Sequence, residues 1–117
     1  MSEKKIQGLL VEPGKKPRRV ETDTDIQTLS RLVDGPVGVT YPVPDMKVFA
    51  VYNEEGKLLF LPPNRWILDP ATGMEWDGMV GTFLLCTHDE EGDLASLTEE
   101  QLKYYEENLD ELMPLVQ

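Results

Sequence analysis

The chain has 117 residues, which suits one domain and is too short for most multidomain enzymes. It carries 22 acidic against 11 basic side chains, a net charge of −11, yet 40% of its residues are hydrophobic, so a folded acidic domain is expected. One cysteine excludes an intramolecular disulfide. No apolar run could span a membrane, and the first residues lack the apolar core of a signal peptide, so we expect a cytoplasmic protein.

The charge is unevenly distributed. Residues 1–20 hold six basic and two acidic groups, whereas the segment from Asp89 onward holds ten acids and one lysine. The acidic segment should repel nucleic acid and anionic membranes, so we expect neither as a direct partner. With one histidine and one cysteine, a His- or Cys-rich metal site is not expected. No phosphate-binding or dinucleotide-binding loop is present, so no cofactor is expected.

The first third of the chain predicts a β-β-α unit. Residues 4–11 are apolar with partial alternation, and residues 18–21 resume after a Pro-Gly turn, which predicts a β-hairpin. A helix should follow, because Thr24 and Gln27 fit a capping box and apolar residues recur at helical spacing: Ile26, Leu29, Leu32 and Val33. We expect Gly35 to end this helix in the left-handed conformation.

The middle of the chain predicts three more strands, at residues 37–41, 48–52 and 57–61. The last two should form a hairpin around a glycine-containing loop at residues 53–56. Two consecutive prolines predict an irregular path for residues 61–66, because proline cannot donate to a strand ladder. Residues 69–77 are expected to form a loop.

The last third predicts a central strand at residues 80–87, with a kink or bulge at Gly81, and then an exposed acidic loop at residues 88–95. Thr98 and Gln101 form a second capping box, and four residues should line the buried face of the helix that follows: Leu102, Tyr105, Leu109 and Leu112. The expected fold is a single α+β domain over residues 1–117. It has a mostly antiparallel sheet of about five or six strands, a β-β-α opening and a C-terminal amphipathic helix.

Asn64 and Arg65 form the first candidate site. The two preceding prolines stiffen the backbone, an arginine fork matches phosphate or carboxylate, and an asparagine can read an amide or a base edge. The alternative, which we favour, is a structural corner in which Asn64 bonds local backbone and Arg65 pairs with an acid.

The basic hairpin tip is the second candidate site, through Lys15, Lys16, Arg18 and Arg19. It could grip phosphate, but it lacks the interleaved aromatic residues typical of nucleic-acid binding. We favour a solvated turn, and the tip could also close electrostatically on the acidic C-terminal half.

Cys86 and His88 lie two residues apart on a predicted strand and should face the same side, as a nucleophile and its base would. No orienting partner occurs at a recognisable spacing, and Cys86 lies in an apolar run, so a buried filler is favoured. The carboxylates of Asp69, Glu75 and Asp77 match no metal loop. These observations argue against an enzyme.

Several short motifs occur in order along the chain: Leu9-Leu10-Val11-Glu12-Pro13-Gly14, Tyr41-Pro42, Asn53-Glu54-Glu55-Gly56-Lys57-Leu58, Leu61-Pro62-Pro63-Asn64-Arg65, Gly81-Thr82-Phe83 and Ser96-Leu97-Thr98-Glu99-Glu100-Gln101. From about Lys5 to Glu107 the chain resembles a family known only as a domain of unknown function (type 3846), found in Gram-positive bacteria, their phages and conjugative elements. The resemblance implies a protein of a phage or mobile element. It supplies no activity or catalytic residues.

For such a protein we expect a non-enzymatic binding or modulator role, directed against host defence. In one hypothesis it is a sponge for a nucleotide-type signal, with Asn64, Arg65 and the basic tip on the phosphates and Tyr41 or Trp66 stacked on a base. In the alternative, the acidic segment from Asp89 onward is a decoy that mimics nucleic acid, or it inhibits a host defence or DNA-binding enzyme by protein–protein contact. A homodimer that completes a core or a pocket across a two-fold axis is also expected.

Overall fold

The computed structural model describes residues 5–116. In chain order its elements are β1 (Lys5–Val11), β2 (Arg18–Asp23), α1 (Ile26–Val33), β3 (Val37–Thr40), β4 (Phe49–Asn53), β5 (Pro63–Leu68), β6 (Glu75–Val80), β7 (Phe83–His88), β8 (Leu94–Ala95) and α2 (Glu99–Leu112). Neither helix is long and apolar enough to cross a membrane within these residues.

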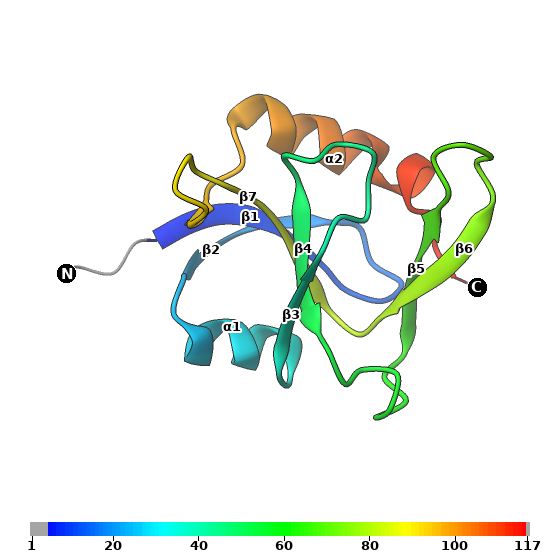
Figure 1. Ribbon diagram of the computed structural model, residues 1–117, viewed down its shortest axis with the longest axis horizontal. Coiled ribbons are helices and arrows are strands. Elements are labelled where there is room, and N and C mark those ends of the chain that lie inside the picture. The colour runs from blue at the N-terminus through cyan, green and yellow to red at the C-terminus, as the bar shows by residue number, and fades with distance from the viewer. Residues whose placement is uncertain (1–4, 117) are drawn as a thin grey trace.

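A six-stranded sheet forms the centre of the molecule (Figure 1). Its strand order is β2-β1-β7-β4-β3, the short β8 pairs with β7, and every pairing is antiparallel. The hairpin β5-β6 forms a separate two-stranded sheet. These features confirm the predicted α+β domain, including its β-β-α opening and C-terminal helix.

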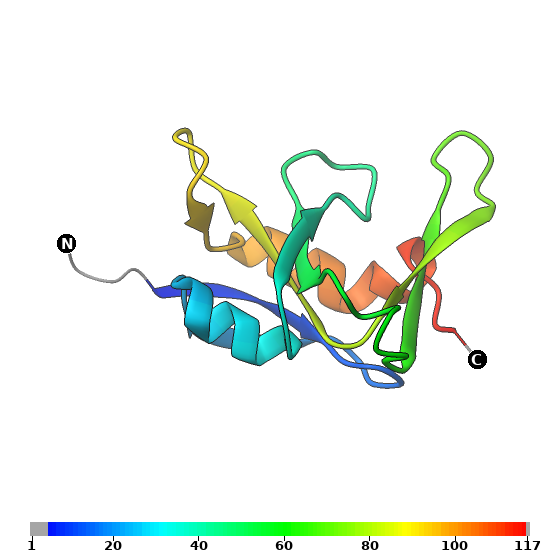
Figure 2. The same ribbon diagram turned by 60° about the horizontal axis from the view of Figure 1, so that its bottom comes forward.

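The two helices cover opposite faces of the sheet, as Figures 1 and 2 show. Strand residues alternate between the faces. One set packs toward α2 and the β5-β6 hairpin, and includes Leu9, Val11, Phe83 and Leu85. The other set packs toward α1, and includes Ile6, Leu10, Leu84 and Cys86. Because β1 and β7 are buried on both faces, they read as apolar runs rather than as strict alternation.

The ends of α1 differ from the prediction by one residue. Asp25, not Thr24, is the N-cap, and its carboxylate accepts a 2.8 Å hydrogen bond from the Thr28 amide. Asp34, not Gly35, adopts the left-handed conformation, with φ of 68°. Gly35 is needed for a different reason, because a Cβ there would lie 2.6 Å from the Asn53 amide nitrogen. The shifted start leaves Ile26 exposed rather than on the buried face.

The start of α2 matches the prediction. The Thr98 hydroxyl accepts from the Gln101 amide, and the Gln101 side chain accepts from the Thr98 amide, at 3.1 and 2.8 Å. Leu102, Tyr105 and Leu109 are buried, and Leu112 is half-buried.

We predict that Thr98→Ala lowers the free energy of unfolding by about 1 kcal/mol, because the first turn of α2 loses one of its two capping bonds. Urea unfolding followed by fluorescence measures this change. Thr72→Ala, in the exposed turn between β5 and β6, is the control and should change stability by less than about 0.5 kcal/mol. An equal effect of both substitutions would contradict the importance of the cap.

The region from 54 to 80 departs most from the prediction. Residues 57–61, expected as a strand, form a turn, and β4 pairs with β3 and β7 instead. The segment expected to be irregular, 61–66, contains the first four residues of β5, which tolerates Pro63 because it is the first residue of the strand. The expected loop at 69–77 contains the start of β6. Gly81, with φ of 73°, is not a bulge within one strand but the link between the two sheets.

Candidate functional site

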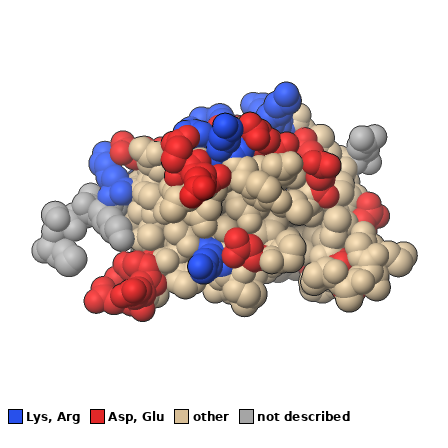
Figure 3. All heavy atoms as spheres, turned by 90° about the horizontal axis from the view of Figure 1, so that it is seen from above, with Lys and Arg blue, Asp and Glu red and all other residues tan. Residues whose placement is uncertain are grey.

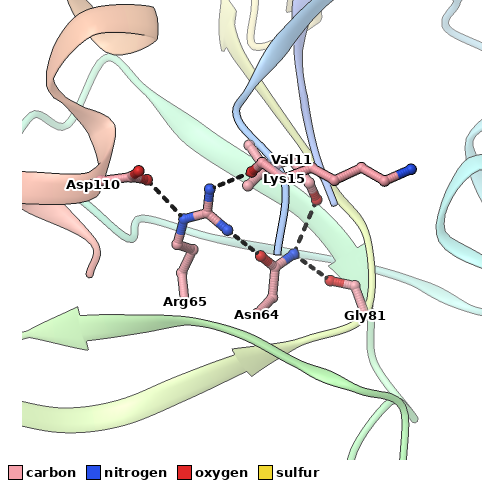
Figure 4. A network of polar contacts seen from close by, with 6 residues as sticks. All are labelled: Val11, Lys15, Asn64, Arg65, Gly81 and Asp110. Atoms are coloured by element: carbon pink, nitrogen blue, oxygen red, sulfur yellow. Dashed lines mark hydrogen bonds and ion pairs between the residues drawn. The ribbon is translucent and has the colours of Figure 1, made fainter. Parts of the chain in front are cut away.

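Asn64 and Arg65 lie at the centre of a polar network that joins four distant parts of the chain (Figure 4). The Asn64 amide nitrogen donates to the carbonyls of Val11 and Gly81, at 3.0 and 2.7 Å. The Arg65 guanidinium donates to the Asn64 side-chain oxygen at 2.6 Å, to the Lys15 carbonyl at 2.7 Å and to the Asp110 carboxylate at 3.1 Å. The network therefore ties β5 to β1, to the hairpin tip, to the link before β7 and to α2.

Local distortion of β5 allows two consecutive side chains to turn inward. The pairing of β5 with β6 shifts register between Pro63 and Arg65. On its other side β5 bonds the C-terminal segment, since the Trp66 amide donates to the Pro114 carbonyl at 2.8 Å and the Val116 amide donates to the Asn64 carbonyl at 3.2 Å. With both edges occupied, neither Asn64 nor Arg65 is left at a free strand edge.

The environment of Arg65 is that of a buried structural group. The residue is 0% exposed, whereas the Asp110 side chain is 47% exposed. A buried guanidinium requires hydrogen-bond partners, and here it has two neutral oxygens in addition to the carboxylate. This burial and these hydrogen bonds agree with the structural interpretation of Asn64 and Arg65. A ligand role would require these bonds to be exchanged for bonds to the ligand.

The basic hairpin tip is partly neutralised by acids. Arg19 binds Glu106 and Glu99 of α2, each at 2.9 Å, and Arg18 binds Glu12 at 3.2 Å. The hydrogen bonds that Arg19 donates to Glu106 and Glu99 raise the pKa of Arg19, and the bond to Arg19 lowers the pKa of Glu99. The expected closure on the acidic C-terminal half is thus confirmed for Arg19.

Two lysines of the tip remain directed outward. Lys15 and Lys16 are exposed, and in Figure 4 the Lys15 side chain extends away from Arg65 although its carbonyl belongs to the network. The tip therefore offers two lysine charges to solvent.

The two aromatic candidates lie apart from the network. The Tyr41 ring contacts Phe49 edge-on, with centroids 6.0 Å apart. Trp66 is half-buried and lies opposite Gly78 of β6, where a Cβ would come 3.6 Å from its ring. Neither ring takes part in the hydrogen-bond network of Asn64 and Arg65, so base stacking by Tyr41 or Trp66 stays a prediction.

Cys86 is fully buried on β7, and this burial raises the pKa of its thiol to about 12. Because the thiolate is the nucleophile, a thiol of this kind is inert at neutral pH. His88, two residues on, stacks on the Phe49 ring at a centroid distance of 5.9 Å. The geometry agrees with the buried-filler interpretation of Cys86.

We predict that Cys86 reacts with a thiol reagent at pH 8 at least about a hundredfold more slowly in the folded protein than in the urea-unfolded chain. The measurement is the rate of release of a coloured thiolate from an aromatic disulfide reagent. The reaction in urea serves as the control that the thiol is present and reduced. Equal rates in both states would contradict the burial of Cys86.

A groove that the sequence analysis missed lies between α2 and the segment from 42 to 48. Its volume is about 660 Å³, within the range of ligand-binding pockets. Its charged lining consists of Asp45, Lys47 and Glu100, and its floor includes Tyr104, Tyr105 and Leu112. Burial, followed by the nearby Asp45 carboxylate, raises the pKa of Tyr105 to about 12. The sequence signal for this groove was the adjacent pair Tyr104 and Tyr105, because only one of two neighbouring rings on a helix can face the core.

Further acidic groups are exposed on α2 and on the loop between β7 and β8, although Glu99 and Asp110 pair with Arg19 and Arg65. Exposed acids of α2 are Glu99, Glu100, Glu107, Asp110 and Glu111, and those of the loop between β7 and β8 are Glu90, Glu91 and Asp93. Figure 3 views this side of the molecule and shows acids scattered over it, with most basic groups along one edge. In the same loop the carboxylates of Asp89, Glu91 and Asp93 lie within 4.8 Å of one another. The Asp89 carboxylate also accepts two backbone amides, so a turn explains this cluster.

A family model described as Domain of unknown function (DUF3846) matches residues 6–110, most of the chain. The chain belongs to the DUF3846 family. No curated protein and no solved structure matched it. The DUF3846 match includes every residue of the Asn64–Arg65 network and all of the groove lining except Leu112.

Proposed function

We propose that this DUF3846 protein is a non-enzymatic binding protein that engages a basic segment of a partner protein in the groove between α2 and residues 42–48. The observation that supports this most directly is the charge of the groove. Asp45 and Glu100 supply two carboxylates against the single ammonium of Lys47, and Tyr104 offers an exposed ring. Carboxylates beside aromatic rings recognise lysine and arginine side chains through ion pairs and cation–π contacts.

The surrounding acids extend this preference beyond the groove. The exposed carboxylates of Glu107 and Glu111 on α2, and those of the loop at 90–93, would attract a basic surface at long range and would increase its association rate. A partner of this kind is a protein that binds nucleic acid, since its own ligand is an anionic backbone. We therefore favour the protein inhibitor or acidic decoy of a host defence or DNA-binding enzyme, acting in the host cytoplasm and encoded by a phage or mobile element.

The nucleotide sponge is the competing hypothesis. It requires cations that converge on phosphate. Arg65 is bonded within the fold, Arg19 is held by Glu99 and Glu106, and Arg18 pairs with Glu12, which leaves Lys15 and Lys16 as the other exposed cations of the tip. Two lysines on a hairpin form a smaller anion site than the one expected from the sequence, and the overall charge of −11 opposes an anionic ligand.

A titration with a short fluorescent arginine-rich peptide tests the proposal. The groove variant combines Glu100→Lys with Tyr104→Ala, and the matched control combines Glu75→Lys with Trp76→Ala on β6, so both lose one acid and one exposed ring. We expect the groove variant to weaken binding at least about tenfold and the control by less than about threefold. Equal losses would indicate nonspecific attraction to net charge and would overturn the groove assignment.

Native mass spectrometry with a panel of cyclic dinucleotides tests the competing hypothesis. We expect no adduct on the wild-type protein. A stoichiometric adduct that disappears with Lys15→Ala and Lys16→Ala would establish the nucleotide sponge in place of the proposed function.

A further inference from the structure

The groove between α2 and residues 42–48 has a carboxylate and an aromatic ring side by side on one helix. Glu100 and Tyr104 both line this groove, and they lie four residues apart on α2. Side chains at this spacing are neighbours on one face of a helix. A ligand that reaches the Tyr104 ring therefore also lies beside the Glu100 carboxylate.

The Tyr104 ring is oriented by the fold and is still open to a ligand. It contacts the buried Tyr105 ring at a centroid distance of 5.0 Å, with the two ring planes at 88°. This T-shaped contact occupies at most one face of the Tyr104 ring, and the residue is 49% exposed. A ring that is already oriented can stack on a flat group at a low entropic cost.

Glu100 is the available carboxylate of α2 in this groove. It is exposed, and within residues 5–116 its carboxylate forms no ion pair or hydrogen bond. Three other acids of the helix are already used, because Glu99 and Glu106 bind Arg19 and Asp110 binds Arg65. Glu100 can therefore pair with a cation of a partner without breaking a contact of the fold.

Asp45 supplies a second carboxylate, from the segment that faces α2 across the groove. One of its oxygens accepts a 2.9 Å hydrogen bond from the Lys47 backbone amide, which fixes the position of the side chain. A carboxylate has about four acceptor positions, so Asp45 can accept further donors. A cation in the groove thus meets one unpaired carboxylate and one whose position is fixed.

These three groups suit a guanidinium better than an ammonium. A guanidinium is planar and has five N–H donors, so its edge can pair with Glu100 and Asp45 while its face lies on the Tyr104 ring. An ammonium is a compact and strongly hydrated charge with three donors. It can form an ion pair with either carboxylate, but it has no flat face to stack on the ring.

We propose that Glu100, Tyr104 and Asp45 form a specificity site that takes an arginine side chain of the partner in preference to lysine. The inference rests on the proposed function, because it assigns the type of residue that the groove binds. Tyr104 determines the preference, since the two carboxylates attract either cation. The partner is then a protein that exposes an arginine where it docks on α2.

Three fluorescent peptides of one length and sequence pattern test the preference, with arginine, lysine or uncharged citrulline at the same positions. We expect wild-type protein to bind the arginine peptide at least about fivefold more tightly than the lysine peptide, and the citrulline peptide least tightly. Tyr104→Leu should reduce the ratio of arginine to lysine affinity to below about twofold, whereas Tyr104→Phe keeps the ring and should retain the ratio. Because the lysine peptide should still bind Tyr104→Leu, it reports that the groove is folded. A ratio that Tyr104→Leu leaves unchanged would overturn the proposal.

Lys47 offers a test that a folding defect cannot imitate. Its side chain lines the groove and repels a bound cation, so Lys47→Ala should strengthen the binding of both charged peptides about twofold or more. Lys103→Ala removes an exposed lysine of α2 that is not part of the groove lining, and this control should have a smaller effect. Equal gains from both substitutions would show attraction to net charge alone and would overturn the site.

The groove variant that combines Glu100→Lys with Tyr104→Ala separates this inference from the proposed function. If wild-type protein binds the arginine and lysine peptides equally and the groove variant weakens both, the preference for arginine is wrong and the proposed function stands. If neither peptide loses affinity in the groove variant, the proposed function is wrong as well.

Discussion

Arg65→Ala is expected to lower the free energy of unfolding by about 3–5 kcal/mol, the range found when a large buried side chain is truncated to alanine. The substitution leaves the Asn64 side-chain oxygen and the Lys15 carbonyl without their donor, and it empties the space of a fully buried side chain. A loss of this size is a large fraction of the stability of a small domain. Urea unfolding followed by tryptophan fluorescence measures it.

Two further variants separate the role of Arg65 from that of arginines in general. Arg65→Lys should recover only part of the loss, because an ammonium group cannot reproduce the planar fork that reaches three partners. Arg31→Ala removes an exposed arginine of α1 and should cost less than about 0.5 kcal/mol. If Arg65→Ala is as well tolerated as Arg31→Ala, the network does not support the fold, and the arginine is free to serve a ligand.

Asn64→Asp is expected to lower the free energy of unfolding by about 3 kcal/mol or more, although it replaces only the side-chain NH2 group by an oxygen. The Asn64 amide nitrogen donates to two carbonyls, and a carboxylate oxygen at the same place would face both of them without a proton. One carboxylate oxygen would still accept from Arg65, but the other would be repelled by both carbonyls and would leave them without a donor. The measurement is the midpoint of urea unfolding at pH 7. The midpoint reports the change in stability when the dependence of the free energy of unfolding on urea concentration is the same in both proteins.

Asn53→Asp is the matched comparison. Asn53 is also buried, but its amide nitrogen donates to one carbonyl, that of Asp34, at 3.0 Å, and its oxygen accepts from the Glu55 amide. We expect a cost of roughly 1–3 kcal/mol there, smaller than at Asn64. A reversed order of the two costs would contradict the central position assigned to Asn64.

Local patterns sufficed for the elements that carry their own signals. The strands β1 and β7 are apolar runs, and α2 has a complete capping box before its apolar stripe. The Pro-Gly turn predicted the hairpin β1-β2. In these segments the residues that determine the structure are sequence neighbours, so single-sequence reasoning could use them.

The β5-β6 hairpin could not be predicted in this way, because distant partners stabilise it. Pro62 precedes β5, Pro63 is its first residue and a polar stretch precedes β6, so neither strand has a clear sequence pattern. β5 is fixed by the C-terminal segment at Pro114 and Val116, about 50 residues away in sequence. The segment at 57–61 was wrongly predicted as a strand because its residues are apolar. In the structure the side chains of Leu58, Leu59 and Phe60 are exposed, and the segment pairs with no strand.

The candidate site shows the same difference between local sequence patterns and contacts with distant residues. The sequence identified Asn64 and Arg65 as unusual, and it favoured a structural role, with which the network agrees. It could not identify Val11, Lys15 and Gly81 as their partners, because these residues accept through backbone carbonyls, which every residue type has. The groove on α2 was missed for a related reason, since its lining comes from three separate segments.

The most direct test of the proposed function is a ¹H–¹⁵N spectrum of the labelled protein, titrated with the arginine-rich peptide and, separately, with a cyclic dinucleotide. We predict that the peptide shifts the amide signals of Asp45, Glu100 and Tyr104 at the groove and that the dinucleotide shifts none. Shifts confined to the dinucleotide titration and centred on Lys15 and Lys16 would contradict the proposed function and establish a nucleotide-binding protein.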